Sequence, residues 1–63
     1  MKILLVGGGG REHTLAWKIS QSKLCDKLFI APGNAGTTAF GENVPITVND
    51  FEALALFCIS NSI

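Results

Sequence analysis

The sequence predicts an α/β fold built on a parallel strand–helix–strand unit, and three observations indicate this. An uninterrupted apolar run at residues 3–6 leads directly into four glycines at residues 7–10. A segment with the apolar spacing of a helix follows, and a second apolar run comes at residues 28–31. Short, unbroken apolar runs are typical of strands that are buried on both faces of a parallel sheet.

The first strand is predicted at residues 2–6, and the four glycines after it form what we call the glycine loop, residues 7–10. Consecutive glycines destabilise a strand or a helix, but they suit a sharp turn that a ligand approaches closely. Because a helix is predicted directly after the loop, free backbone N–H groups and the positive end of the helix dipole point to one spot. Such a spot binds anions, most often phosphate. The alternative interpretation is a tight turn that binds nothing.

The first helix is predicted at residues 11–22, and its apolar residues share one face: Leu15, Ala16 and Ile19. His13 and Trp17 lie four residues apart on a second face. The second strand is predicted at residues 28–31. A strand, a helix and a strand in this order form a parallel pair, so the loops after both strands leave the same edge of the sheet.

The second strand is followed by another turn-forming segment, Pro-Gly-Asn-Ala-Gly-Thr at residues 32–37, which we call the second loop. At the carboxyl edge of a parallel sheet, this loop is expected beside the glycine loop. Two loops of small residues at that edge form the usual ligand crevice of open α/β sheets.

The remaining chain is predicted to hold a loop at residues 38–43 and a short extended piece at a sheet edge at residues 44–48, interrupted by Pro45. A second helix is predicted from residue 50 to about residue 59, with Asn49 as its N-cap and Glu52 completing a capping box. We expect it to face the sheet through Phe51, Leu54, Ala55 and Cys58. Its other sides are also apolar and carry Leu56, Phe57 and Ile59.

A helix that is apolar nearly all round is normally covered on more than one side, and two strands with two helices cannot cover it. We therefore expect the sequence to be the N-terminal piece of a longer protein, with a third parallel strand after residue 63 lying beside the first strand. We also expect the 63 residues alone not to form a stable monomer, since the core of so short a chain is marginal.

Composition argues against several classes of function. The formal net charge is zero and no basic stripe is present, which disfavours nucleic-acid binding. The longest apolar run, residues 53–59, is too short to span a membrane. Cys25 and Cys58 form no CxxC pair, and free thiols favour the cytoplasm. No cluster of carboxylate, histidine or cysteine side chains indicates a metal site.

Two common phosphate-binding motifs do not fit. If the dinucleotide fingerprint G-x-G-x-x-G began at Gly7 or Gly8, its third glycine would fall on Glu12 or His13. No acidic residue follows the second strand, and Asp26 precedes that strand, so it is expected at the wrong end. A P-loop is excluded because no Gly-Lys-Ser/Thr follows the glycines.

Three segments carry a family resemblance: GGGGREHTLAWK at residues 7–18, APGNAGT at residues 31–37 and DFEAL at residues 50–54. Together they resemble the opening of the phosphoribosylamine–glycine ligases, also called glycinamide ribonucleotide synthetases. Gly8 departs from the many members that carry another residue there. The resemblance implies a Rossmann-like, partial N-terminal (pre-ATP-grasp) domain over residues 1–63. The family's enzymes are much longer than this sequence and belong to the ATP-grasp superfamily.

The resemblance also implies a reaction, the second step of purine biosynthesis. ATP activates glycine as an acyl phosphate, and the amine of 5-phosphoribosylamine attacks it to give glycinamide ribonucleotide. ATP, Mg²⁺ or Mn²⁺, and glycine would bind in later domains of the ligase chain, so the 63 residues are expected to be inactive alone. They would hold no catalytic or metal-binding residue. Their partners would be phosphoribosylamine or glycinamide ribonucleotide and the rest of the ligase chain. The alternative function is a dinucleotide-binding module of an oxidoreductase.

Transferred onto this sequence, the resemblance implies substrate-binding residues in both loops and in the first helical turn: Gly8, Gly9, Gly10, Arg11, Glu12, Gly33, Asn34 and Gly36. Side-chain chemistry leaves alternatives open for several residues. Arg11 pairs with a phosphate or is solvated, and Glu12 accepts ribose hydroxyls or complements the helix dipole. Asn34 binds a ligand or its own turn. His13 is a general base or, more commonly, packs on Trp17 or bonds to the backbone.

Overall fold

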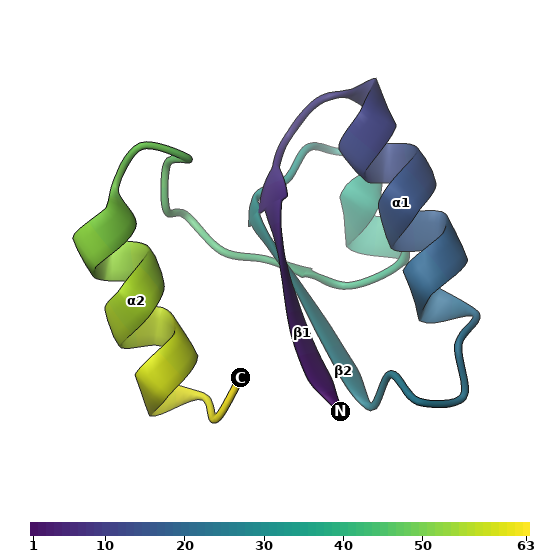
Figure 1. The fold of residues 1–63 in the computed structure, drawn as a ribbon. Coiled ribbons are helices and arrows are strands. Elements are labelled where there is room, and N and C mark those ends of the chain that lie inside the picture. Colours follow the sequence, from purple (N-terminus) through teal and green to yellow (C-terminus); the bar gives the residue numbers. More distant parts are fainter.

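The computed structural model describes residues 1–63 and has a three-stranded parallel sheet with a helix on each side (Figure 1). The strands are β1 (Lys2–Gly7), β2 (Lys27–Pro32) and β3 (Glu42–Asn43), in the spatial order β1-β2-β3. The helices are α1 (Gly10–Ser20) and α2 (Phe51–Ser60), with a short 3₁₀ helix, η1 (Thr37–Ala39), after β2. The predicted α/β class and parallel strand–helix–strand unit are confirmed.

The pairing of β1 with β2 fixes the positions of the two loops. The strands run parallel in a register that begins with Lys2 opposite Lys27 and ends with Gly7 opposite Pro32. Both strands therefore end at the same level of the sheet, and the glycine loop and the second loop lie side by side at its carboxyl edge, as predicted. The other edge of β1 has no neighbouring strand.

Alternate residues of β2 form two separate cores. Leu28 and Ile30 are buried on the α1 side with Ala16. Phe29 and Ala31 are buried on the opposite side, where partly buried residues of α2 pack against them. Because successive side chains of a strand point to opposite faces, the unbroken apolar run of β2 serves both cores. Burial on both faces therefore holds for β2. It does not hold for the first apolar run, of which Ile3, Leu4 and Leu5 are half-buried and Val6 is 42% exposed.

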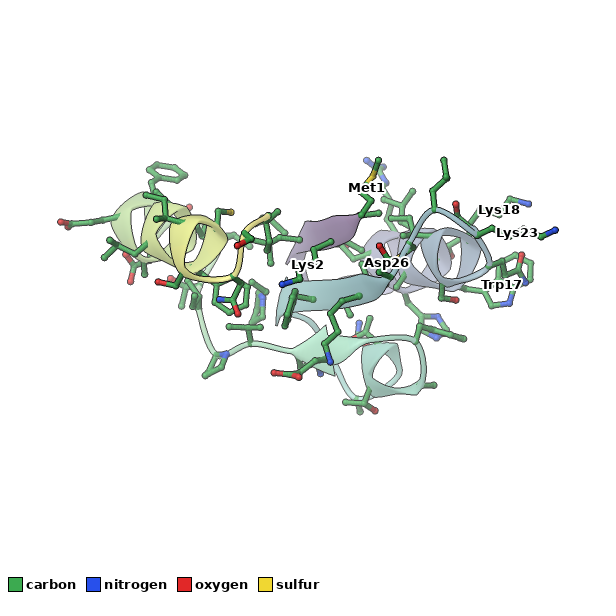
Figure 2. All side chains as sticks on the ribbon, turned by 90° about the horizontal axis from the view of Figure 1, so that it is seen from below. Met1, Lys2, Trp17, Lys18, Lys23 and Asp26 are labelled. Carbon is green, nitrogen blue, oxygen red and sulfur yellow. The ribbon has the colours of Figure 1, made fainter.

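The first helix is confirmed with shifted ends: α1 runs from Gly10 to Ser20 instead of residues 11–22. Ala16 is fully buried and Ile19 packs beside it, but Leu15 lies at the flank and is exposed. Figure 2 shows the side chain of Trp17 at the outer side of α1, away from the sheet, and Trp17 is 48% exposed.

The prediction of a plain loop at residues 38–43 is wrong, because this segment contains the end of η1 and all of β3. β3 pairs with β2 in parallel, and the backbone N–H of Val44 extends the pairing by donating to the Ile30 carbonyl at 2.8 Å. The next N–H on that side of the chain, that of Ile46, donates to the Val44 carbonyl at 2.7 Å instead of to β2, so the pairing stops there. The extended edge piece predicted at residues 44–48 is accordingly not a strand, and the strand lies just before it.

The second helix begins one residue later than predicted, because its N-cap is Asp50 and not Asn49. The Asp50 carboxylate accepts a hydrogen bond from the backbone N–H of Ala53 at 3.2 Å. Asp and Asn are equally good N-caps, and a turn from Thr47 to Asp50 decides between them. With Asp50 as the cap, the third helical residue is Ala53, and the predicted capping box with Glu52 does not form.

The face of α2 that meets the sheet also differs from the prediction. Leu54 and Phe57 pack against the core on that side, and the rings of Phe57 and Phe29 meet edge to face with centroids 5.0 Å apart. Of the four residues predicted to face the sheet, Leu54 does so and Cys58 is half-buried, but Ala55 is exposed and Phe51 is 74% exposed. Phe57, which was not predicted to face the sheet, is therefore on the inner side of the helix. Two further large apolar side chains of α2 remain exposed, Leu56 and Ile59.

The amino ends of the strands carry an ion pair far from the loops. The N-terminal ammonium of Met1 pairs with the carboxylate of Asp26, the residue before β2 (Figure 2). The hydrogen bond from this ammonium, and then its positive charge, hold the pKa of Asp26 below its ordinary value of 3.8. Asp26 therefore lies at the end of the sheet opposite the two loops, as predicted. The cysteines are free thiols, and neither helix has the length and apolar character needed to cross a membrane.

Candidate functional site

The glycine loop and the second loop are joined by three hydrogen bonds to consecutive carbonyls. The backbone N–H of Gly33 donates to the Gly7 carbonyl at 2.9 Å. The side-chain Nδ2 of Asn34 donates to the Gly8 carbonyl at 2.8 Å and to the Gly9 carbonyl at 3.3 Å. The second loop therefore holds every carbonyl from Gly7 to Gly9.

These bonds also set the direction of the N–H groups. A trans peptide is planar, and its C=O and N–H point in opposite directions. When the carbonyls of Gly7, Gly8 and Gly9 point to the second loop, the N–H groups of the following residues point away from it. The N–H of Gly9 donates to Oε2 of Glu12 at 3.0 Å. The N–H groups of Gly8 and Gly10 have no acceptor in the chain.

The first turn of α1 adds two more donors, the N–H groups of Arg11 and Glu12, which also have no acceptor in the chain. The first N–H groups of a helix lack intrahelical partners, and the helix dipole makes this end positive. Because Gly9 is the N-cap and has no side chain, only one half of a capping box forms, from Gly9 N–H to Glu12. The result is a row of backbone donors suited to an anionic or hydroxyl-rich ligand.

Glycine is required at some of these positions and not at others. Gly7 has φ +144° and Gly33 has φ +74°, which side chains disfavour. At Gly8, a Cβ would lie 2.7 Å from the Gly33 carbonyl oxygen, so the loops could not approach. At Gly10, a Cβ would meet no atom within 4 Å. Packing within the chain therefore explains Gly7, Gly8 and Gly33, but it does not explain Gly10.

Gly9 of the glycine loop and Gly36 of the second loop are both exposed, and the predicted crevice between the loops is not present as a pocket. A Cβ at Gly9 would meet only Oε2 of Glu12, at 3.1 Å. A Cβ at Gly36 would lie 2.9 Å from Cδ2 of His13. The His13 side chain of α1 therefore lies against Gly36 and leaves little room for a larger residue. The backbone of Gly9, by contrast, has only the Glu12 carboxylate beside it.

Glu12 gives the site an acceptor beside the donors. Its side chain is half-buried, and its carboxylate lies against the Gly9 N–H. An anion is repelled from this position, but a hydroxyl or amine of a ligand is attracted to the carboxylate. The exposed Arg11 is the neighbouring cation and forms no ion pair within the chain. The site therefore combines donors for an anion with an acceptor for hydroxyl groups.

The hydrogen bonds of Asn34 bear on whether its side chain binds a ligand or its own turn. Its Oδ1 accepts from the N–H groups of Gly36 at 2.8 Å and Thr37 at 3.1 Å. Its Nδ2 uses both hydrogens on the glycine loop. A side-chain amide has two donor hydrogens and two lone pairs on its oxygen. Asn34 therefore bonds its own turn and the neighbouring loop, with no side-chain capacity left over.

Two polar residues that the sequence did not single out for the site lie directly beneath Asn34. Thr37 is fully buried (0% exposed), and its Oγ1 accepts from the Asn34 N–H at 2.8 Å. Asn43 of β3 donates from Nδ2 to the Asn34 carbonyl at 2.8 Å, and its Oδ1 lies 2.7 Å from Thr37 Oγ1. The Asn-x-x-Thr spacing is a local turn signal, but nothing local identifies Asn43.

His13 packs against a ring, but not against Trp17. Its ring contacts Phe40 with centroids 5.4 Å apart, and the same ring lies against Gly36. The side chain therefore joins α1 to the chain that follows η1. This placement fits the packing interpretation of His13.

Comparison with known proteins extends the sequence resemblance. The chain matches the family described as "Phosphoribosylglycinamide synthetase, N domain" over residues 1–63. It is 52% identical over 65 residues to the phosphoribosylamine–glycine ligase of Pasteurella multocida, covering 100% of this chain and 15% of that protein. The ligase of the same name from Haemophilus influenzae is 58% identical over 59 residues, covering 90% of this chain and 14% of that protein.

A relative from a eukaryote shows the same similarity. The bifunctional purine biosynthetic protein of Schizosaccharomyces pombe is 49% identical over 65 residues, which is 95% of this chain and 8% of that protein. The chain spans only 8% to 15% of the length of these three relatives. The family match, by contrast, covers every residue from 1 to 63, and the chain accordingly belongs to the phosphoribosylglycinamide synthetase N-domain family.

Proposed function

We propose that this chain is the N-terminal part of an ATP-dependent ligase that joins glycine to 5-phosphoribosylamine, giving glycinamide ribonucleotide for purine biosynthesis. Within that enzyme, the surface formed by the glycine loop, the first turn of α1 and the second loop binds the phosphoribosyl group. The proposal rests on membership of the family and on the names of its relatives. It also rests on the site's chemistry, because a phosphoribosyl group carries both an anion and hydroxyl groups.

The observation that carries the binding role is the row of unpaired N–H groups beside the open backbone of Gly10. In this proposal the N–H groups of Gly10 and Arg11 bind the anionic side of the ligand, with the Arg11 side chain beside them. The Glu12 carboxylate accepts from a hydroxyl or amine. Gly8, Gly9, Gly33, Asn34 and Gly36 shape this surface through backbone and turn contacts.

The remaining parts of the ligase reaction are assigned outside these residues. ATP, with Mg²⁺ or Mn²⁺, and glycine bind in ATP-grasp domains of the longer chain. No catalytic residue is assigned to residues 1–63. A cytoplasmic location is proposed because Cys25 and Cys58 are free thiols, which persist in reducing compartments. The comparisons do not support the oxidoreductase alternative, since the matched relatives are ligases and a purine biosynthetic protein.

Gly10→Val in the full-length ligase tests the binding role. Apart from the chain neighbours and the backbone of its own helix, no atom lies within 4 Å of the added Cβ position. The valine therefore meets no packed side chain, and it takes the space of a ligand. We expect KM for phosphoribosylamine to rise by about tenfold or more, as for removal of contacts worth at least 1.4 kcal/mol. KM for glycine and for ATP serve as internal controls and stay within about twofold. Equal increases in all three constants would contradict the proposal.

A further inference from the structure

We propose that Thr37 and Asn43 are positioning residues that orient the glycine loop for the phosphoribosyl substrate. This inference rests on the proposed function for the identity of the ligand. Thr37 is fully buried, Asn43 is half-buried, and neither side chain forms a hydrogen bond with the glycine loop. Both act through Asn34, the single side chain that joins the second loop to the carbonyls of Gly8 and Gly9.

The first step is the fixation of Asn34 from below. Its backbone N–H donates to Thr37 Oγ1, and its backbone carbonyl accepts from Asn43 Nδ2. Its side-chain oxygen accepts from the N–H of Thr37. The backbone N–H, the backbone carbonyl and the side-chain oxygen of Asn34 are therefore all hydrogen-bonded, which fixes the orientation of the residue. Two of these bonds are made by the side chains of Thr37 and Asn43.

The second step is the link between Thr37 and Asn43. The Thr37 hydroxyl has one hydrogen, and Asn43 Oδ1 lies 2.7 Å from Oγ1. The Asn34 carbonyl, 2.9 Å from the same Oγ1, already accepts from Asn43 Nδ2. The two side chains thus support each other and tie the second loop to β3. A buried polar group that loses its partner costs more than a typical hydrogen bond contributes.

The third step is the packing of this cluster against Gly33. A Cβ at Gly33 would meet the Asn43 side chain, and it would lie 2.7 Å from Thr37 Oγ1. The cluster therefore fills the space under the residue whose N–H bonds the Gly7 carbonyl. The three hydrogen bonds from the second loop to the glycine-loop carbonyls all come from Gly33 or Asn34, and Thr37 and Asn43 contact both of these residues.

The test uses the full-length ligase and a pair of adjacent threonines. Thr37→Val keeps the shape of the side chain but removes the buried hydroxyl. Thr38→Val is the matched control, because the Thr38 hydroxyl is exposed and bonds only the Ala35 carbonyl. Thr37→Ser restores the hydroxyl. Asn43→Ala removes the β3 end of the cluster and gives a second, independent variant.

Two readouts separate positioning from a general loss of structure. The first is the dissociation constant for glycinamide ribonucleotide, with KM for ATP and glycine measured beside it. The second is hydrogen exchange at the Gly33 amide, which reports the contact with Gly7. We expect Thr37→Val to weaken ribonucleotide binding by about tenfold and to accelerate exchange. Asn43→Ala should act in the same direction. Thr37→Ser and Thr38→Val should stay within about twofold of wild type.

The outcomes are distinguishable. Unchanged ribonucleotide binding in Thr37→Val and Asn43→Ala overturns the inference, as does an equal rise in the constants for ATP and glycine. If the wild-type ligase does not bind glycinamide ribonucleotide at all, the proposed function fails. Exchange at Gly33 then still decides the positioning role: acceleration in Thr37→Val but not in Thr38→Val supports it, and equal rates overturn it.

Discussion

Asn34 donates from its side-chain Nδ2 to the carbonyl of Gly8, twenty-six residues earlier in the chain, at 2.8 Å. The same amide accepts through Oδ1 from two N–H groups of its own turn. One side chain thus performs two tasks, closing the second loop and fixing the glycine loop. The two tasks use different atoms, so they can be separated experimentally.

Asn34→Asp is expected to keep the turn and lose the contact between loops. The carboxylate still accepts from Gly36 and Thr37, but it cannot donate to the Gly8 and Gly9 carbonyls. Because these contacts are only half-buried or exposed, their loss costs about 1 kcal/mol, as for a typical hydrogen bond. We expect a lower melting temperature and weaker glycinamide ribonucleotide binding in the full-length ligase. Asn49→Asp is the control, since Asn49 is exposed. A variant that melts and binds as wild type would refute this assignment.

Gly33→Ala is expected to destabilise the folded protein, and Gly10→Ala is not. Gly33 has φ +74°, and its Cβ would displace the side chains of Asn43 and Thr37. Gly10 is the first residue of α1 and has open space around it. Replacing a helical glycine by alanine stabilises the helix by up to about 1 kcal/mol. Thermal melting of the full-length variants should show a loss for Gly33→Ala and no loss for Gly10→Ala. A loss of equal size in both would be inconsistent with the geometry.

Blocking the N-terminal ammonium of Met1 is expected to raise the pKa of Asp26, because the ion pair between them is lost. The hydrogen bond and charge of the ammonium lower the pKa of Asp26 from 3.8. A carboxylate with a depressed pKa stabilises the folded state above its unfolded pKa, and the contribution is lost as pH falls through the folded pKa. Acetylation should return the pKa of Asp26 toward 3.8 and remove this acid sensitivity. NMR titration of the Asp26 carboxyl checks it; identical curves with and without acetylation would exclude the pair.

The isolated 63-residue chain is expected not to be a stable monomer. Phe51, Leu56 and Ile59 of α2 are exposed, at 74%, 59% and 77%. The free edge of β1 offers unpaired donors and acceptors. We expect circular dichroism to show no cooperative melting at monomer mass, and sedimentation to show association. A sharp, concentration-independent transition of a monomer well above room temperature would contradict this expectation.

Sequence pattern predicted the elements up to the second loop better than the elements after it. The apolar runs and the glycines placed β1, α1, β2 and both loops, because these signals are local and strong. β3 was missed, since two residues, Glu42 and Asn43, carry no periodicity. The orientation of α2 was predicted wrongly because its apolar residues surround the helix, so that no single face is marked.

The candidate site shows the same division between local and tertiary information. The sequence by itself determined that a glycine loop and a second turn would follow two parallel strands, because strand order fixes the edge at which the loops emerge. Only the tertiary structure decided that the Asn34 side chain forms hydrogen bonds with Gly8, Gly9 and its own turn, and that Thr37 and Asn43 hold Asn34 in place. These contacts join residues from different elements, and their partners depend on sheet register and packing, which no local pattern in the chain records.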